Sequence, residues 1–381
     1  MSAVVRLAPA QEPAPARIAL FGTGVVGSAF VARYLHLRER GVHLPDIAWL
    51  ANSRIVLECR DDLAVMIEQA RAFSPPLQKG DTGGFASPAE IPPSPPFAKG
   101  GVEKCLRRGD IVVDATASET VAGKHAQWLA RGIHVVTANK LGNGADWSRA
   151  QAIRQAGESG ARYGDSATVG AGLPLIRSIR ELVRGGDRIH RVEGVLSGSL
   201  AWLFNHYDGM RPFSGFVRKA KEAGYTEPDP RIDLSGEDVR RKLLILARAA
   251  GLPLQAADIR VDSLVPAALA ALPAGEVDAQ LDQLDLPLGE RFREAYRNGE
   301  KLRFLGRFDS EGNASVGLAT LPADHPLCGG SGTDNKVAIF SDRYDTNPLV
   351  IQGPGAGAEV TAAALLDDVL GINAPPFPFA M

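Results

Sequence analysis

An acidic segment that runs into a helix carries the side chains best suited to acid–base chemistry. Residues 225–242 read YTEPDPRIDLSGEDVRRK, with several carboxylates ahead of Lys242. Asp238 and Lys242 are four residues apart and therefore share one helix face, while Ser235 and Asp238 match the capping box of a helix start. Spacing alone favours a capped helix with a solvated ion pair. The apolar helix face that follows indicates instead a partly desolvated lysine, whose ammonium loses its proton more readily.

A glycine motif near the start of the chain has the pattern that holds a dinucleotide. Gly22, Gly24 and Gly27 form GxGxxG between an apolar run at 17–21 and a helical pattern at 25–37. The three glycines allow a tight turn, a close approach of backbone to a diphosphate, and helix packing on the strand, and the helix N-terminus attracts the anion. Such a turn can be purely structural, but the strand–helix segments behind it favour dinucleotide binding.

The residues after the second expected strand bear on the choice of cofactor. An acid there would bond the ribose 2′-hydroxyl of NAD, whereas an arginine favours the 2′-phosphate of NADP. The sequence places Ser53 and Arg54 at this point, with no acid before Glu58. We therefore predict NADP, with Ser53 and Arg54 as contacts. NAD stays the alternative, since Arg54 is also an ordinary surface residue for a loop.

The elements that must position these residues predict an α/β fold. Strands and helices alternate up to residue 178, which is typical of a Rossmann-type, doubly wound nucleotide-binding domain. The rest predicts an α+β catalytic and dimerisation domain with an antiparallel hairpin. Expected strands are 17–21, 46–50, 110–116, 133–139, 161–163, 189–196, 302–308, 314–321, 337–340 and 349–351; expected helices are 25–37, 57–73, 121–131, 147–156, two or three within 200–250, and one ending at 370.

The domain boundaries follow from this pattern. A flexible tail (1–16) precedes a dinucleotide-binding domain made of 17–178 and 336–381, and the substrate and dimerisation domain is 179–335. Within the first domain, 74–101 is rich in proline and glycine and repeats an SPP-x-x-KG element, so it reads as a low-complexity surface loop.

Composition excludes several classes of protein. The formal charge of the 381 residues is −2, so no global field attracts nucleic acid or an anionic membrane. There is no apolar run long enough for a membrane helix. Cys59, Cys105 and Cys328 are odd in number and far apart, which excludes a disulfide scaffold and favours the cytoplasm.

Motifs along residues 17–370 resemble the homoserine dehydrogenase family. They include FGTGVVGSAF, DATAS, VVTANK, ATVGAGLP, VEGVLSGSLAWL, GYTEPDPRIDLSGEDVRRKLLIL and LVIQGPGAGAEVTA. The resemblance implies reversible conversion of L-aspartate 4-semialdehyde to L-homoserine with NAD(P)H, in threonine, methionine and isoleucine biosynthesis. It also implies a homodimer formed through the sheet of the second domain. The chain leaves no room for the regulatory domain or kinase domain that some members carry, so we expect no threonine feedback through such a domain.

The resemblance assigns roles residue by residue. Lys242 and Asp238 take the acid–base chemistry with Lys140 nearby, and Glu227 and Asp233 take the amino-acid end of the substrate. The cofactor contacts are Gly22, Thr23, Gly24, Val25, Val26, Gly27, Ser53, Arg54, Thr116, Ala117, Lys140, Gly357 and Glu359. The backbone carbonyls of Val169, Ala171 and Leu173 would hold a monovalent cation.

Two positions depart from the family pattern, and two rival functions remain. Ser166 stands where the family often has a glutamate for the cation, and Ile232 where some members have an acid. The enzymatic rival is another Rossmann-type amino-acid or aldehyde dehydrogenase, such as aspartate-semialdehyde dehydrogenase, which acylates a cysteine. The other rival is a non-catalytic dinucleotide-binding regulator.

Overall fold

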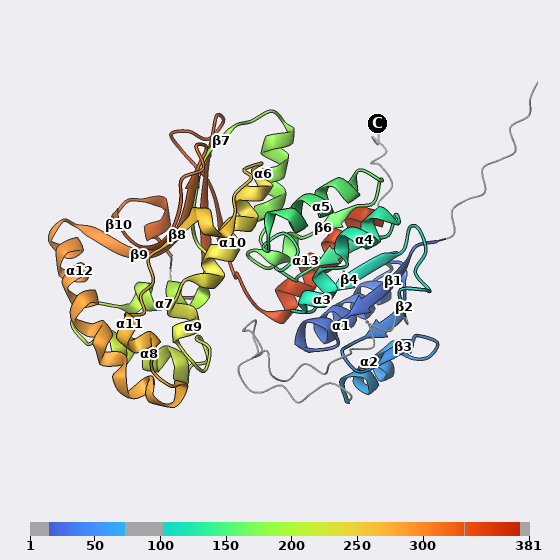
Figure 1. The fold of residues 1–381 in the computed structure, drawn as a ribbon, viewed down its shortest axis with the longest axis horizontal. Coiled ribbons are helices and arrows are strands. Elements are labelled where there is room, and N and C mark those ends of the chain that lie inside the picture. Colours follow the sequence, from blue (N-terminus) through green and yellow to red (C-terminus); the bar gives the residue numbers. More distant parts are fainter. Residues whose placement is uncertain (1–14, 73–101, 331, 374–381) are drawn as a thin grey trace, which may run out of the picture.

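The chain folds into two domains, each built around one β-sheet, and the second domain follows the last strand of the first sheet (Figure 1). The structure, a computed structural model, describes residues 15–72, 102–330 and 332–373. The predicted loop at 74–101 lies outside the described residues, as does the predicted tail apart from residues 15 and 16. Among the described residues, no helix has the length and apolar character needed to cross a membrane.

The first domain is a Rossmann-type sheet in the order β3-β2-β1-β4-β5-β6. All pairings are parallel except the edge pair β2–β3. β1 and β4 are almost wholly buried apolar runs, as central parallel strands are. The strands are β1 (Arg17–Phe21), β2 (Asp46–Ala51), β3 (Val56–Glu58), β4 (Ile111–Asp114), β5 (His134–Thr137) and β6 (Tyr163–Gly164), and the helices are α1 (Val25–Glu39), α2 (Leu63–Ala72), α3 (Glu119–Ala122), α4 (His125–Ala130) and α5 (Trp147–Gly157).

The second domain holds a mostly antiparallel sheet in the order β12-β11-β7-β9-β10-β8. Its long hairpin, β9 with β10, confirms the predicted antiparallel pair. The helices pack on one face through a large apolar core. The strands are β7 (Ile189–Val195), β8 (Ile259–Val261), β9 (Glu300–Asp309), β10 (Ala314–Pro322), β11 (Asn335–Ser341) and β12 (Leu349–Gly353), and the helices are α6 (Leu175–Arg184), α7 (Gly198–His206), α8 (Phe213–Glu222), α9 (Arg231–Leu234), α10 (Glu237–Ala249), α11 (Ala267–Ala270) and α12 (Asp285–Arg297).

The chain crosses the domain boundary at positions that differ from the prediction. α6 packs into the second core from Leu175 onward, so the predicted boundary at 178 cuts a helix. β11 and β12 belong to the second sheet, not to the first domain. The return is made by α13 (Ala358–Asn373) alone, which buries Leu365 and Val369 in the core beside α1. In Figure 1 this helix, drawn red, lies among the blue and teal elements of the first domain.

Two helix predictions also need correction. The expected helix at 57–73 begins only at Leu63, and Val56–Glu58 instead extends the sheet edge by pairing with β2. The expected helix at 121–131 is two short helices separated at Gly123.

Candidate active site

The glycine turn after β1 has the geometry of a diphosphate site. Gly22 has φ +98°, and a Cβ there would lie 2.6 Å from the carbonyl oxygen of Ala115. A Cβ on Gly27 would lie 1.9 Å from the carbonyl oxygen of Gly22, so the helix touches the turn. Around Gly24, by contrast, a Cβ would meet no atom of the described residues within 4 Å. The N-terminus of α1 therefore opens onto free space and has no side-chain cap, which fits a bound anion.

Asn52 shapes the turn that presents Ser53 and Arg54. Its buried amide Nδ2 donates to Thr23 Oγ1 (2.9 Å) and to the carbonyl of Ala70 (2.8 Å). Its Oδ1 accepts from the backbone N–H of Arg54 at 2.8 Å. These hydrogen bonds of Asn52 fix the backbone of the turn, while the Arg54 side chain is exposed to solvent. Sequence reasoning gave Asn52 no role, although an asparagine after a strand is a common turn former.

The other predicted cofactor residues gather around the same end of the sheet. Thr116 lies beside the glycine turn, with its Cγ2 3.0 Å from the position of a Gly22 Cβ, and Ala117 next to it is exposed. Gly357, with φ +125°, and Glu359 lie at the start of α13, the helix that packs along α1. Val25, in the first turn of α1, is 48% exposed. These positions from three parts of the chain border one region.

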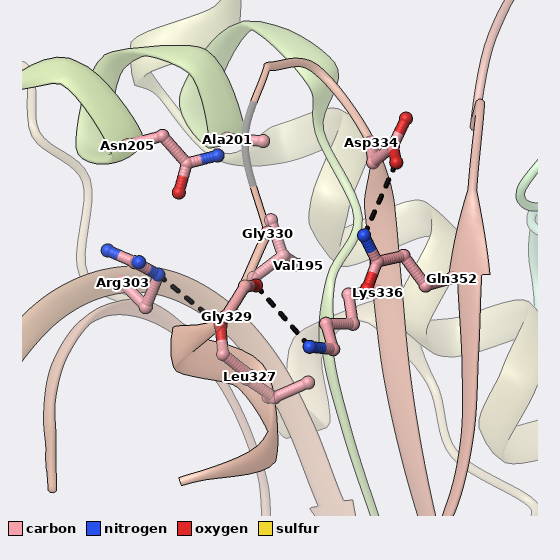
Figure 2. A pocket seen from close by; sticks show the side chains of 10 residues that line it. All are labelled: Val195, Ala201, Asn205, Arg303, Leu327, Gly329, Gly330, Asp334, Lys336 and Gln352. Carbon is pink, nitrogen blue, oxygen red and sulfur yellow. Dashed lines mark hydrogen bonds between the residues drawn. The ribbon is translucent and has the colours of Figure 1, made fainter. Parts of the chain in front are cut away.

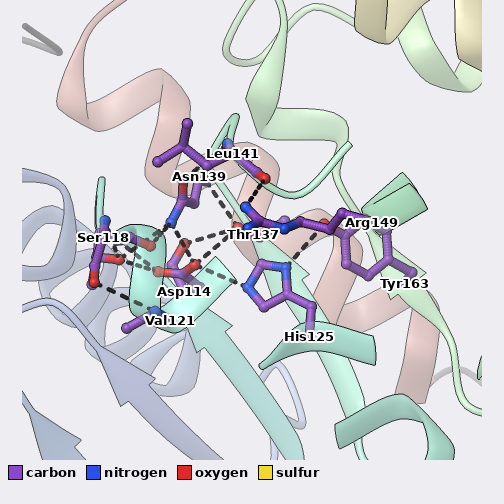
Figure 3. Close-up of polar contacts among 10 residues, drawn as sticks. Asp114, Ser118, Val121, His125, Thr137, Asn139, Leu141, Arg149 and Tyr163 are labelled. Atoms are coloured by element: carbon purple, nitrogen blue, oxygen red, sulfur yellow. Dashed lines mark hydrogen bonds and ion pairs between the residues drawn. The ribbon is translucent and has the colours of Figure 1, made fainter. Parts of the chain in front are cut away.

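A buried polar network at the ends of β4 and β5 anchors the segment before Lys140 (Figure 3). The Asp114 carboxylate accepts from Thr116 Oγ1 (2.6 Å) and Asn139 Nδ2 (3.0 Å), and lies 3.0 Å from His125 Nε2. Tyr163 Oη is 3.1 Å from the other ring nitrogen of His125. Asp114 and His125 are fully buried. Buried polar groups of this kind must all be paired, so the network fixes the backbone that carries Lys140.

Lys140 and Lys242 converge on one carboxylate. Lys140 Nζ donates to Asp238 Oδ1 at 2.7 Å, and Lys242 Nζ lies 2.8 Å from Asp238 Oδ2. Lys242 also donates to the carbonyl of Leu196 at 2.7 Å. The first lysine comes from the nucleotide domain and the second from α10. The side chain of Asp238 is 41% exposed and that of Lys242 only 10%, so the cluster is reached from solution at the carboxylate.

Burial and the neighbouring charges shift the pKa values of Lys140 and Asp238 in opposite directions. Burial lowers the pKa of Lys140, and the charge of Asp238 opposes the shift only in part. For Asp238, burial favours protonation, but the ammonium groups of Lys242 and Lys140 outweigh it and hold the pKa well below its usual range. The carboxylate therefore stays ionised between two cations.

Helix α10 does not begin with the predicted capping box. Its N-cap is Gly236, in the left-handed region at φ +78°, and no side chain caps the helix. Ser235 Oγ instead accepts from the N–H of Glu237 at 3.3 Å. The carboxylate of Asp238 is consequently free of capping and turns to the two lysines. Both sequence interpretations of the Asp238–Lys242 pair were incomplete, because neither included Lys140.

Asp233 lies in the short helix α9, and Glu227 lies in the loop that precedes it. Asp233 Oδ1 accepts from Ser199 Oγ (2.7 Å), and Oδ2 accepts from the backbone N–H of Glu227 (2.8 Å). Burial raises the pKa of Asp233. The charge of Asp238 also raises the pKa of Asp233, and the charge of Lys242 opposes this, so Asp233 lies within electrostatic range of the lysine–carboxylate cluster. Asp233 thus holds the turn on which Glu227 sits.

The predicted cation loop is tightly built. Val169 and Ala171 are buried, and Ala171 adopts φ +48°, which costs an alanine roughly 1–2 kcal/mol. The carbonyl of Leu173 accepts from the N–H of Leu175 at 2.8 Å. Asp165 is committed to an ion pair with Arg180 (2.5 Å). No carboxylate is therefore supplied by the residues next to Ser166.

A carboxylate reaches this loop from α13 instead. Asp368 Oδ1 accepts from Ser166 Oγ (2.8 Å) and Oδ2 from its backbone N–H (3.0 Å). The Asp368 side chain is 10% exposed. Burial raises the pKa of Asp368 to about 6, against the opposing hydrogen bonds from Ser166. No sequence pattern predicts this contact, because its partners lie more than 200 residues apart.

The raised pKa of Asp368 predicts a pH-dependent stability. Between about pH 4 and 6 the folded state holds a proton that the unfolded state releases, so stability falls as pH rises through this window. We expect wild type to lose about 2 kcal/mol relative to Asp368→Asn between about pH 4.5 and 7.5. Urea unfolding at both pH values measures this, with exposed Asp367→Asn as the control. Equal pH dependence of wild type and Asp368→Asn would contradict the assignment.

A small pocket elsewhere in the second domain contains none of the predicted site residues (Figure 2). Its volume is about 290 Å³ including its open mouth, and it is lined by Arg303, Lys336 and Gln352, among others. The buried guanidinium of Arg303 donates to backbone carbonyls, including those of Phe204 and Cys328 at 2.9 Å. Arg303 therefore holds loops together.

Fold and site together define a class of protein. A Rossmann-type domain whose glycine turn fits a diphosphate is joined to a second domain that brings a lysine–carboxylate cluster to the same end of the sheet. This combination is that of the two-domain, dinucleotide-dependent dehydrogenases.

Comparison with known proteins gives the family. The chain matches the homoserine dehydrogenase model over residues 174–370 and the homoserine dehydrogenase NAD-binding domain over residues 22–163. It is 35% identical to the homoserine dehydrogenase of Saccharomyces cerevisiae, with 93% of this chain and 97% of the yeast protein covered. The chain belongs to the homoserine dehydrogenase family.

A larger protein also contains a matching region, and a solved structure shares the fold. The chloroplastic bifunctional aspartokinase/homoserine dehydrogenase 1 of Arabidopsis thaliana is 46% identical over 68% of this chain, but the match spans only 29% of that protein. A hyperthermophilic archaeal homoserine dehydrogenase solved in complex with NADPH superposes with a TM-score of 0.67 at 22% identity, covering 94% of this chain and 98% of that one. The archaeal structure supports the fold.

Proposed function

We propose that this protein interconverts L-aspartate 4-semialdehyde and L-homoserine with a nicotinamide dinucleotide, in the pathway to threonine, methionine and isoleucine. The observation that carries the proposal is the convergence of Lys140 and Lys242 on Asp238, across the two domains. Family membership supplies the substrate class. The dinucleotide, when bound, supplies or accepts the hydride.

Lys242 is the acid–base group in this proposal. Hydride addition to an aldehyde carbon leaves an alkoxide, which needs a positioned cation and then a proton. Lys242 Nζ donates to the carbonyl of Leu196 and lies against Asp238, so its direction is fixed by two acceptors. In the reverse direction the neutral amine takes the proton from the hydroxyl of homoserine. Lys140 adds a second positive charge beside the developing oxyanion.

Glu227 and Asp233 are proposed to hold the amino-acid end of the substrate. A carboxylate binds the substrate ammonium through a charge-assisted hydrogen bond. Asp233 fixes the backbone of Glu227 at 2.8 Å, which supports a shared role. Ile232, where some members have an acid, is 42% exposed and offers no polar group, so this contact falls to its neighbours.

NADP is the proposed cofactor, with NAD as the alternative. Arg54 is exposed on the turn held by Asn52, where a 2′-phosphate would lie. The nearest acid, Glu58, pairs in register with Trp49 and forms an ion pair with Arg60 (2.7 Å), away from the end of β2. No carboxylate of this turn competes for a ribose hydroxyl.

The prediction for Arg54→Ala is a selective loss of NADP. A charge-assisted hydrogen bond to phosphate contributes about 1.5–3 kcal/mol, so KM for NADPH should rise roughly 10- to 100-fold while KM for NADH is unchanged. Steady-state kinetics with both cofactors measure this, and Arg60→Ala is the control because Arg60 is equally exposed but paired with Glu58. Equal losses with both cofactors would refute the assignment.

A monovalent cation at the carbonyls of Val169, Ala171 and Leu173 is part of the proposal. The left-handed Ala171 supports it, because strained backbone is held where it serves a purpose. Ser166 has a hydroxyl in place of the carboxylate that other members often have there, and this hydroxyl donates to the carboxylate of Asp368. Activity titrated with potassium and sodium salts tests the requirement.

We propose a cytoplasmic homodimer that pairs through the second sheet. The helices of this domain cover one sheet face, and the other carries Arg191, Phe340 and Val350 with partly exposed side chains. Cys59, Cys105 and Cys328 form no disulfide within the described residues, as expected in a reducing compartment. Light scattering of the purified protein measures the oligomeric state.

A single assay tests the proposed function. Reduction of NADP and of NAD is followed with L-homoserine, and oxidation of the reduced forms with L-aspartate 4-semialdehyde. No turnover with either cofactor would favour a dinucleotide-binding regulator. Phosphate-dependent oxidation of the semialdehyde would favour the cysteine-dependent rival, which the cysteines themselves disfavour: burial raises the pKa of Cys59 to about 11 and also raises that of Cys328.

A further inference from the structure

One face of α10 carries the contact between the two domains. Asp238, Arg241, Ile245 and Arg248 follow one another at steps of three, four and three residues, and therefore line one side of the helix. The loop between β5 and α5, residues 138–146, lies against this side. A Cβ on Gly144 would be 2.8 Å from Arg241 Cγ and 3.1 Å from Ile245 Cδ1, so helix and loop are in close contact.

The guanidinium of Arg248 binds the C-terminal end of this loop. Its Nη1 donates to the carbonyls of Asn143 and Ala145, the latter at 2.7 Å. Its Nε donates to the carbonyl of Leu254 at 3.1 Å, and the guanidinium lies 5.5 Å from the ring centroid of Trp147. Burial lowers the pKa of Arg248 to about 10. One partly buried guanidinium thus joins the end of α10 to the nucleotide domain.

The contact of Arg248 with the loop leaves a buried hydrogen-bond donor unpaired, which indicates that the contact serves function and not stability alone. Arg248 Nη2 is buried and has no hydrogen-bond partner among the described residues. An unsatisfied buried donor costs about 1–3 kcal/mol. Stability alone would be better served by an apolar side chain of similar length, since a desolvated charge without a carboxylate partner is expensive.

Hydrogen bonds within the 138–146 loop connect the part held by Arg248 to Lys140. Gly144 N–H donates to the carbonyl of Lys140 at 2.8 Å, and Leu141 N–H donates to Asn139 Oδ1 at 3.0 Å. The side chain of Asn143 donates to Asp165 at 2.6 Å. Each end of the loop is therefore tied, and a shift at Asn143 must displace Lys140.

We propose that Arg248 is a positioning residue: it fixes where the 138–146 loop lies along α10 and so holds Lys140 against Asp238. This inference rests on the proposed function of Lys140 and Asp238. Arg248 lies ten residues from Asp238, about 15 Å along the helix, and touches neither substrate nor cofactor. A lysine at this position keeps the charge but cannot donate to both carbonyls in a planar fork.

The experiment compares Arg248→Met and Arg248→Lys with wild type and with Arg240→Met. Arg240 is on the same helix but pairs with Glu237 at 2.5 Å, and no hydrogen bond or ion pair joins it to the loop among the described residues, so it controls for loss of a helix arginine. Two quantities are measured: kcat and KM with homoserine and NADP, and the rate at which an amine-reactive reagent labels Lys140, with exposed Lys219 as the internal reference. Thermal melting ensures that every variant is assayed folded.

We expect both Arg248 variants to lower kcat about 10- to 100-fold, as a displacement near 1 Å does, with a smaller change in KM for NADP and with Lys140 labelled several-fold faster. Arg240→Met should match wild type. Unchanged Lys140 labelling would overturn the proposal even if kcat fell, because the effect would then not act through Lys140. Inactive wild type would refute the proposed function instead, and the labelling comparison would still decide the role of Arg248.

Discussion

Replacing Lys242 should abolish most of the turnover. We expect Lys242→Ala to lower kcat about 10³-fold or more, since general acid catalysis contributes about 10²–10⁴-fold and oxyanion stabilisation about 10²–10³-fold. NADP affinity should be unchanged, because Lys242 is on α10 of the second domain and the glycine turn is in the first. Stopped-flow turnover with homoserine measures the first quantity and fluorescence titration with NADPH the second.

Two further variants separate charge from proton transfer. Lys242→Arg keeps a cation near Asp238 but cannot release a proton at neutral pH, so it should be nearly as slow as Lys242→Ala. Lys219→Ala removes an exposed lysine of α8 and should match wild type. Near-wild-type turnover in Lys242→Ala with normal cofactor binding would show that the acid–base assignment is wrong. High activity in Lys242→Arg would leave only an electrostatic role.

Only part of the fold could be read from the sequence, and the failures have physical causes. The central strands of the first domain were predicted because a strand buried on both faces is a continuous apolar run, as in β1 and β4. The assignment of residues 336–381 to the first domain was wrong for β11 and β12. It rested on the order of strand, glycine-rich turn and helix, which the start of the first domain shares. Only the helix, α13, packs into the first domain, while both strands pair in the second sheet.

Short elements were missed because three residues carry no periodicity. Val56–Glu58 was assigned to a helix although it forms the sheet edge. The start of α10 was misread because a left-handed Gly236, not Ser235, ends the preceding turn. Local sequence rules describe such positions only when the turn type is known.

The candidate site, like the fold, could be predicted from the sequence only in part. Asp238 and Lys242 could be paired by spacing, since four residues separate them on a helix. Lys140 is 98 residues away from Asp238, and only the family resemblance joined it to them. The carbonyl of Leu196, which directs Lys242, leaves no trace in any residue type because every residue has a backbone carbonyl. Arg248 did carry a signal: it shares the helix face of Asp238.

Asp238 should control the pH range of activity. It is the carboxylate partner of both Lys140 and Lys242, and it counteracts the effect of burial on Lys140. In Asp238→Asn that counteraction is lost, so the pKa of Lys140 falls further. A cationic side chain with a lower pKa loses its proton at lower pH. The alkaline limb of the kcat/KM profile should therefore move to lower pH.

We expect Asp238→Asn to lower kcat about 10²-fold at neutral pH and to move this limb by about one pH unit or more, because one unit corresponds to about 1.4 kcal/mol of lost interaction. Rates measured from mildly acid to alkaline pH locate the limb. Glu237→Gln is the matched control, since Glu237 is the adjacent acid and pairs with Arg240, not with the lysines. A limb at the wild-type position would mean that Asp238 does not set the protonation of Lys140. Asp238 would then serve only to hold Lys140 and Lys242 in place, and kcat would still fall in Asp238→Asn, because the amide keeps one acceptor oxygen and turns a donor NH2 toward the other lysine.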